Sequence, residues 1–123
     1  MSEKLDLVIW NRVFSLKVLF DCFDDEKVLD SQRAALKNFK EADISASLDQ
    51  VKQFCLDQNG KEIGTTIDNI FKYVVPYSVY IPRKQKESTA ALLCHYRFDI
   101  ENDLALIFDN GNLVKICNPD YIL

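Results

Sequence analysis

Hydrophobic and polar residues alternate near the N-terminus. Over residues 14–20 the apolar side chains fall mainly on every second position, and this period predicts a half-buried strand. Residues 5–10 are rich in side chains that favour strands, and Asn11 with Arg12 offers a turn between the two runs. We therefore expect an N-terminal β-hairpin.

The spacing of apolar positions becomes helical in the middle of the chain. Asp30 or Ser31 offers a side-chain oxygen for capping, and residues 32–40 place apolar side chains on one face. Apolar residues recur at helical spacing between residues 44 and 55, and the Asn-Gly pair at residues 59–60 is typical of a helix end. These patterns predict two helices.

A third and shorter helix is predicted over residues 67–74. Residues 65–68 form a weak capping box, and apolar side chains then recur on one face. Pro76 sets the end of this helix, because the residue before a proline avoids helical backbone angles.

Alternation returns in the C-terminal part. Strands are predicted over residues 77–81, 89–98, 104–108 and 113–117. Asn110-Gly111 lies between the last two, and Asn-Gly between apolar runs is the strongest short signal for a hairpin. The sequence therefore predicts a C-terminal meander that ends in a tight β-hairpin.

A two-residue turn at this point would place Phe108 opposite Leu113 and Ile107 opposite Val114. Both faces of that hairpin would then be mostly apolar. An antiparallel sheet usually exposes one face to water. We therefore expect helices on one face, with the N-terminal hairpin, a second copy of the chain or a partner on the other.

The order of strands, then helices, then strands favours an α+β fold. We expect a single domain over residues 1–123. An antiparallel sheet of about five or six strands, formed by the N-terminal hairpin and the C-terminal meander, would pack against two or three helices.

Composition narrows the class of partner. The chain has 15 Lys and Arg against 19 Asp and Glu, a net charge of −4. Such a surface repels a phosphate backbone, so direct nucleic-acid binding is disfavoured and a basic protein partner is favoured. We find no signal peptide pattern and no apolar run long enough to span a membrane, which predicts a cytoplasmic location and no membrane partner.

No group of residues predicts catalysis or a metal centre. Residues 99–110 begin like a calcium-binding loop, but Leu104 replaces its glycine and Asn110 its bidentate glutamate. His95 is the only histidine, and its alternation predicts an exposed position on a strand. The four cysteines lie in apolar segments, as expected of buried, reduced thiols. We therefore predict a protein that is not an enzyme and needs no cofactor or metal.

Two acidic clusters are candidates for binding a partner. One precedes the first predicted helix, and the other crowds the loop before the strand that begins at residue 104. Complementary charge raises the rate of encounter and rejects wrong partners, although solubility alone is an alternative role for any one of these residues. The candidate contact residues are Asp24, Asp25, Glu26, Asp99, Glu101 and Asp103.

The C-terminal half resembles a known family of small bacterial domains. Residues 67–71 (IDNIF), 75–81 (VPYSVYI) and 98–111 (FDIENDLALIFDNG) follow one another in that family's order. The family's usual loop reads aromatic-Asp-x-Glu-His-Gly-Leu, followed by a strand and an Asn-Gly turn. Asn102 and Asp103 stand here in place of the histidine and glycine, and both tolerate the left-handed conformation, so the turn should survive.

That family resembles the immunity proteins of polymorphic-toxin and contact-dependent growth-inhibition systems. The resemblance implies that the protein binds and neutralises the C-terminal domain of a cognate bacterial toxin, in particular a nuclease. It would mask the toxin's active site or substrate groove, and a basic toxin surface would suit the acidic clusters. Two alternatives stay open: a small-molecule-binding domain or enzyme with a pocket between helices and sheet, and a homo-oligomeric module such as a homodimer.

Overall fold

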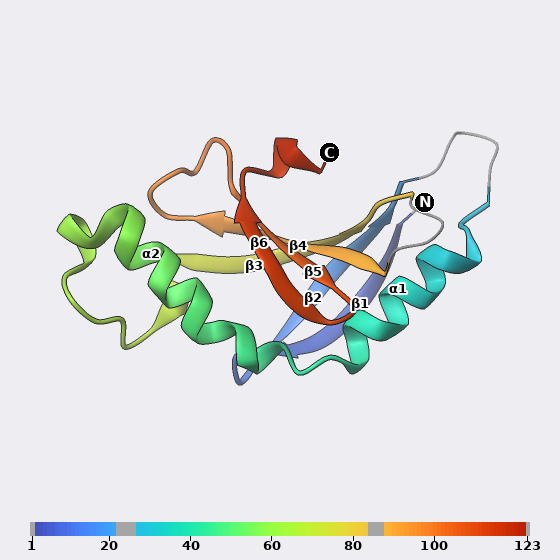
Figure 1. Cartoon of the computed structure of the whole chain (residues 1–123), viewed down its shortest axis with the longest axis horizontal. Coiled ribbons are helices and arrows are strands. Elements are labelled where there is room, and N and C mark those ends of the chain that lie inside the picture. Colours follow the sequence, from blue (N-terminus) through green and yellow to red (C-terminus); the bar gives the residue numbers. More distant parts are fainter. Residues whose placement is uncertain (1, 22–26, 84–87, 123) are drawn as a thin grey trace.

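A mixed β-sheet of six strands forms the centre of the molecule, and the long helices lie on one side of it (Figure 1). The computed structural model describes residues 2–21, 27–83 and 88–122. The strands lie in the order of the sequence: β1 (Ser2–Ile9), β2 (Arg12–Phe20), β3 (Val74–Ile81), β4 (Thr89–Tyr96), β5 (Leu104–Asp109) and β6 (Asn112–Cys117). The helices are α1 (Asp30–Glu41) and α2 (Leu48–Ile63), with short 3-10 turns η1 (Ile44–Ser47), η2 (Ile70–Lys72) and η3 (Pro119–Tyr121). The predicted α+β fold is confirmed.

One pair of neighbouring strands is parallel, and the sequence patterns did not indicate it. Lys17 on β2 lies opposite Ser78 on β3, and Phe20 lies opposite Ile81. Between these strands the chain passes through α1 and α2, and a parallel pair needs a long crossover of this kind. The remaining pairs are antiparallel. The prediction of an antiparallel sheet was therefore wrong for the β2–β3 pair alone.

The N-terminal hairpin turns at Trp10 and Asn11, one residue earlier than predicted. These residues have φ angles of 50° and 69°, and Ile9 pairs directly with Arg12. A tryptophan rarely adopts positive φ. Here its side chain is only 4% exposed, and its Nε1–H donates a hydrogen bond to Ser47 Oγ at 3.2 Å. Burial of the indole therefore offsets an unfavourable backbone angle.

A buried glutamine ties the start of α1 to the parallel strand pair. The helix begins at Asp30 without the predicted side-chain cap, and Leu29 occupies the cap position. The N–H of Leu29 donates to Gln32 Oε1 at 2.9 Å. Gln32 Nε2 donates to the main-chain oxygens of Asp21 at 2.9 Å and Ile81 at 3.2 Å. These hydrogen bonds satisfy a side chain that is only 1% exposed.

α2 continues past the Asn-Gly pair that was predicted to end it. Asn59 leaves helical angles (φ −134°, ψ 31°) and kinks the helix, and its Oδ1 accepts a hydrogen bond from the Tyr96 hydroxyl at 2.6 Å. The helix ends at Ile63, before Gly64, whose φ is 108°. The predicted helix end was therefore wrong, and the Asn-Gly pair marks a kink.

The prediction of a third helix over residues 67–74 was also wrong. Only the short turn η2 forms there, and the Phe71 N–H donates to Asn69 Oδ1 at 3.1 Å. β3 begins at Val74 and includes Pro76, next to an irregularity in its pairing with β4. A proline fits a strand at such a point, because no regular ladder hydrogen bond is lost.

The C-terminal hairpin turns at Asn110 and Gly111 as predicted. Their φ angles are 49° and 83°, and Asp109 pairs with Asn112 across the turn. Gly111 also packs closely against the end of α1. A Cβ atom at this position would lie 2.8 Å from the Cβ of Ala42, so both the backbone angle and the close packing require glycine.

A β-bulge changes the register of this hairpin beyond its first pairs. Phe108 lies opposite Leu113 as predicted, but Ile107 lies opposite Lys115 instead of Val114. Val114 is the extra residue, and its side chain is 60% exposed. The predicted pairing was therefore wrong beyond the Phe108–Leu113 pair, because the residue types around a bulge are those of an ordinary strand.

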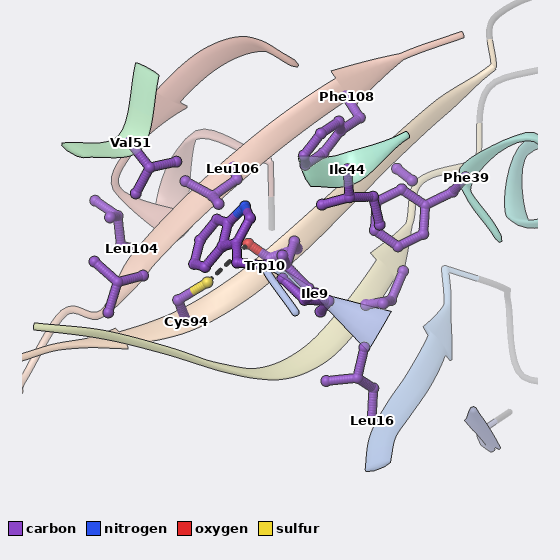
Figure 2. Close-up of a cluster of buried hydrophobic side chains, with 14 of the residues drawn as sticks. Ile9, Trp10, Leu16, Phe39, Ile44, Val51, Cys94, Leu104, Leu106 and Phe108 are labelled. Atoms are coloured by element: carbon purple, nitrogen blue, oxygen red, sulfur yellow. Dashed lines mark hydrogen bonds between the residues drawn. The ribbon is translucent and has the colours of Figure 1, made fainter. Parts of the chain in front are cut away.

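The main core lies between the sheet and the helices. Figure 2 shows the Trp10 indole among buried side chains from both hairpins and both helices, including Ile9, Leu16, Phe39, Val51, Cys94, Leu104, Leu106 and Phe108. Phe39 of α1 meets Phe108 of β5 edge to face, with ring centroids 5.3 Å apart. The core therefore joins the N-terminal hairpin, the crossover helices and the C-terminal strands.

A smaller apolar cluster lies on the opposite face of the sheet. Its buried residues are Ala91, Leu93, Ala105 and Ile107. Tyr77, Tyr80 and Ile122 pack against it, and η3 lies on this side of the sheet in Figure 1. Part of the cover expected on this face thus comes from the C-terminal segment. The N-terminal hairpin does not provide it, because that hairpin extends the sheet.

Candidate partner-binding surface

The loop between β4 and β5 carries one of the two predicted acidic clusters. We refer to residues 99–103 as the acidic loop. Asp99 and Glu101 are exposed, and Asp103 is half-buried. Between the two exposed carboxylates stands Ile100, whose side chain is 75% exposed. The loop therefore presents an apolar side chain flanked by negative charge.

Hydrogen bonds within the acidic loop define its shape. The N–H of Asp103 donates to the main-chain oxygen of Asp99 at 3.0 Å, and Asn102 Nδ2 donates to Asp99 Oδ1 at 3.0 Å. Asp103 has a φ of 63° and takes the left-handed conformation that the sequence predicted. The turn therefore forms without a glycine at this position.

Asp103 fastens the acidic loop to the sheet. The Tyr77 hydroxyl donates to Asp103 Oδ2 at 2.9 Å, and His95 Nδ1 lies 3.1 Å from Asp103 Oδ1. The rings of Tyr77 and His95 are stacked, with centroids 4.2 Å apart and planes 13° apart. Both oxygens of this carboxylate are thus engaged within the domain, and His95 is exposed on its strand as predicted.

Aromatic rings support the start of the same loop. Phe98 stacks on Tyr73 with centroids 5.7 Å apart and meets Tyr96 edge to face at 5.7 Å. The N–H of Arg97 donates to the main-chain oxygen of Tyr73 at 2.8 Å. These contacts hold the end of β4 against the start of β3, so the exposed side chains of the loop stand on a firmly packed base.

The acid–base properties of the nearby groups favour a structural role for them. Burial, followed by the hydrogen bond to Asp103, raises the pKa of Tyr77 to about 12, so the phenol is protonated at neutral pH. Burial raises the pKa of Cys55 to about 11 and that of Cys94 well above its usual value. Burial also raises the pKa of Cys117. These thiols are poor nucleophiles at neutral pH, because the thiolate is the reactive form.

A pocket of about 330 Å³ separates the acidic loop from α2 and the end of β6. Asp99 and Asp103 lie on one side of it, and Phe54, Asn59 and Asn118 contribute to its other sides. The carboxylates of the acidic loop therefore border a hollow as well as the outer surface.

A larger groove of about 540 Å³ continues from this pocket between α2 and β6. Phe54 and Ile116 line both the pocket and the groove, so the two hollows adjoin each other. Asp49 and Asp57 of α2 border the larger groove. The two hollows together follow α2 and carry carboxylates at both ends.

The structure brings only part of the predicted contact residues together. Asp24, Asp25 and Glu26 lie outside the described residues, whereas Asp99, Glu101 and Asp103 share one loop. Sequence reasoning missed the exposed Ile100, because an isoleucine between strands is ordinarily assigned to a core. It also missed Asp49 and Asp57. Their separation by eight positions, which places both on one face of a helix, was a usable signal.

Two further findings apply to the residues that the structure describes. No three or more His, Cys, Asp or Glu side chains within these residues are arranged to hold a metal ion. No helix in this part of the chain is both long and apolar enough to cross a membrane.

The fold and surface define an α+β domain with a crossover between hairpins and an acidic face along α2 and the β4–β5 loop. The chain belongs to DUF6985, a family of domains of unknown function whose model matches residues 2–123. No curated protein and no solved structure matches the chain.

Proposed function

We propose that the domain is an immunity protein that binds a bacterial toxin domain and covers its active site or substrate groove. The observation that carries this proposal is the acidic loop, where exposed Ile100 stands between Asp99 and Glu101. Protein interfaces are commonly built from an apolar anchor within a polar rim. A loop already ordered by its own hydrogen bonds loses little conformational entropy on binding.

Charge supports the same proposal. The chain has a net charge of −4. Carboxylates belong to the acidic loop itself and also line the adjoining pocket and groove. A nuclease holds its substrate with basic residues, so an acidic inhibitor would occupy that surface favourably. Opposite charge would also accelerate capture of the toxin. The resemblance of residues 67–71, 75–81 and 98–111 to a family of domains similar to immunity proteins is consistent with this function.

Growth rescue tests the proposal. A candidate toxin domain, sought in the reading frame immediately upstream, would be co-expressed with the parent protein, with Ile100→Ala or with Val8→Ala. Val8 is the matched control, because it is also an exposed aliphatic residue, 59% exposed on β1 at the far edge of the sheet. Ile100→Ala should weaken toxin binding about 10- to 30-fold and reduce rescue, as expected for an interface anchor. Val8→Ala should rescue like the parent.

The kinetics of association provide a second readout. Reversing charge at Asp99 and Glu101 to lysine should slow association with a basic toxin, and more strongly at low salt than at high salt. Failure of the parent protein to bind or rescue would contradict the proposed function itself. Equal rescue by Ile100→Ala and the parent would remove the acidic loop from the binding surface.

A further inference from the structure

The groove between α2 and β6 has one polar and negatively charged wall. Asp49, Gln53 and Asp57 lie four residues apart along α2, which places them in one stripe on the helix surface. Gln53 Nε2 donates a hydrogen bond to Asp57 Oδ1 at 2.8 Å. This bond orients the amide along the stripe and leaves the second oxygen of Asp57 available for another donor.

The opposite wall is a strand with an open edge. β6 is the last strand in the sheet order, so no neighbouring strand within the described residues pairs with its outer edge. Phe54, Leu113 and Ile116 are half-buried in the groove and give it an apolar floor. An open strand edge beside an apolar floor can accept a further strand, whose main-chain groups pair with the edge.

Within the described residues, no cation forms an ion pair with Asp49 or Asp57. Lys115 is the only basic residue among those that line it, and its Nζ lies 3.7 Å from the centroid of the Tyr121 ring. Tyr121 belongs to η3, on the opposite side of the sheet from α2 (Figure 1). The ammonium group therefore points away from Asp49 and Asp57, and the groove keeps a net negative charge.

We infer that this groove receives an extended segment of a protein partner that carries lysine or arginine and adds to β6 as a seventh strand. The inference rests on the proposed function, because the segment would belong to the neutralised protein. Its main chain would pair with β6, its apolar side chains would lie over Phe54 and Ile116, and its cations would meet Asp49 and Asp57.

Geometry sets the spacing of the cations. Eight helical positions separate Asp49 from Asp57, a distance of about 12 Å along the axis. Residues four apart in an extended strand are separated by about 13 Å and point to the same side. The expected segment therefore reads basic-x-apolar-x-basic, with the central side chain directed at the floor of the groove.

A second copy of this chain fits the groove poorly. Antiparallel pairing of two β6 edges would keep both α2 helices on the same side of the extended sheet. The stripes of Asp49 and Asp57 from the two copies would then face each other, and like charges across an interface are unfavourable. Charge thus selects a basic partner over self-association.

The test uses two labelled heptapeptides and the full chain. The first reads Thr-Lys-Thr-Val-Thr-Lys-Thr, and the second replaces both lysines with glutamate. Fluorescence anisotropy should show saturable binding of the lysine peptide alone. The double variant Asp49→Asn/Asp57→Asn should bind it about tenfold more weakly. The matched control, Asp6→Asn/Asp68→Asn, removes two exposed carboxylates that do not line the groove and should bind like the parent.

Amide chemical shifts of residues 113–116 give an independent readout, because strand addition must perturb them. Binding of both peptides with equal affinity, or equal binding by the groove variant and the parent, would overturn the inference. A dimer that the lysine peptide dissociates would also overturn it by assigning the edge to a second copy. Growth rescue separates the two proposals: if the groove variant still neutralises the toxin fully, the groove assignment fails while the immunity function stands.

Discussion

The two terminal hairpins form opposite edges of one sheet and make the same kind of turn by different means. Asn110-Gly111 combines two residues that accept positive φ, and it was located from the sequence. Trp10 and Asn11 also have positive φ, but tryptophan has no local preference for it. The C-terminal turn is therefore specified by its own residues, whereas the N-terminal turn is specified by what Trp10 packs against.

The two edges also differ in what they offer to a partner. β1 pairs with β2 in an unbroken register from Ser2 to Ile9, and none of the residues that line the pocket and the groove beside α2 lies on it. β6 carries a bulge after Leu113 and borders the groove beside α2. Bulges bend a strand and interrupt its pairing, and they are frequent beside functional sites. The irregular edge is thus the better candidate for binding.

Replacing Trp10 should have the largest effect on stability. Trp10→Ala removes the indole from the core and its hydrogen bond to Ser47, and it should lower the free energy of unfolding by about 3–5 kcal/mol. Trp10→Gly loses the same contacts but relieves the positive φ, so it should be about 1 kcal/mol more stable than Trp10→Ala. Urea denaturation followed by circular dichroism measures both.

The difference between these two variants decides whether burial offsets strain at the N-terminal turn. Equal stability of Trp10→Ala and Trp10→Gly would show that the turn is unstrained. The contrast between the hairpins would then be one of packing alone.

An intermediate effect is expected at the C-terminal turn. Gly111→Ala introduces a Cβ at a φ of 83° and 2.8 Å from the Cβ of Ala42, and it should cost about 2–3 kcal/mol. The double variant Gly111→Ala/Ala42→Gly removes the clash but keeps the backbone angle. Urea denaturation of the four proteins in this cycle separates the two contributions.

If the close approach matters, the loss caused by Gly111→Ala should be smaller in the Ala42→Gly background than in the parent. If the losses of unfolding free energy caused by Gly111→Ala and Ala42→Gly simply add in the double variant, the whole effect of Gly111→Ala comes from the backbone angle. The C-terminal turn would then be specified by local conformation alone.

The hairpins also show how far sequence patterns reach. Alternation located β2, and the residue types of residues 5–10 located part of β1. Two apolar runs located β5 and β6, and the Asn-Gly signal between them located the turn to the residue. The bulge at Val114 was missed because every residue near it is compatible with a strand. The parallel β2–β3 pair was missed because it depends on how the crossover helices pack and not on local spacing.

The candidate site was predicted only in part for the same reason. The acidic loop is continuous in sequence, so composition revealed Asp99 and Glu101. The groove combines α2 with β6, which are distant in the chain, and only tertiary structure brings Asp57 beside Ile116. Local turn chemistry was also misread at Asn59, where the hydrogen bond from Tyr96 accompanies a kink within the helix.

The smallest of the three expected effects concerns alkaline pH, which acts on the C-terminal part of the sheet. All five tyrosines lie at or after residue 73, so the N-terminal hairpin contains none. Burial raises the pKa of both Tyr77 and Tyr80 from 10.0 to about 12, and a nearby aspartate adds to each shift. The fold therefore favours the neutral phenols. Their contribution is complete below pH 10 and is lost as pH rises from 10 to about 12.

Urea midpoints measured by Trp10 fluorescence at a series of pH values test this expectation. The urea midpoint of the parent should fall above pH 10. The midpoint of Tyr77→Phe should fall less steeply, because phenylalanine has no group that ionises at this position. At neutral pH the same variant should cost about 1 kcal/mol, since Asp103 loses a hydrogen-bond donor. An identical alkaline slope in the parent and in Tyr77→Phe would show that Tyr77 titrates alike in the folded and unfolded chains. Asp103 would then gain no stability from the neutral Tyr77 phenol, and the acidic loop would be held to the sheet by its other contacts, such as that with His95.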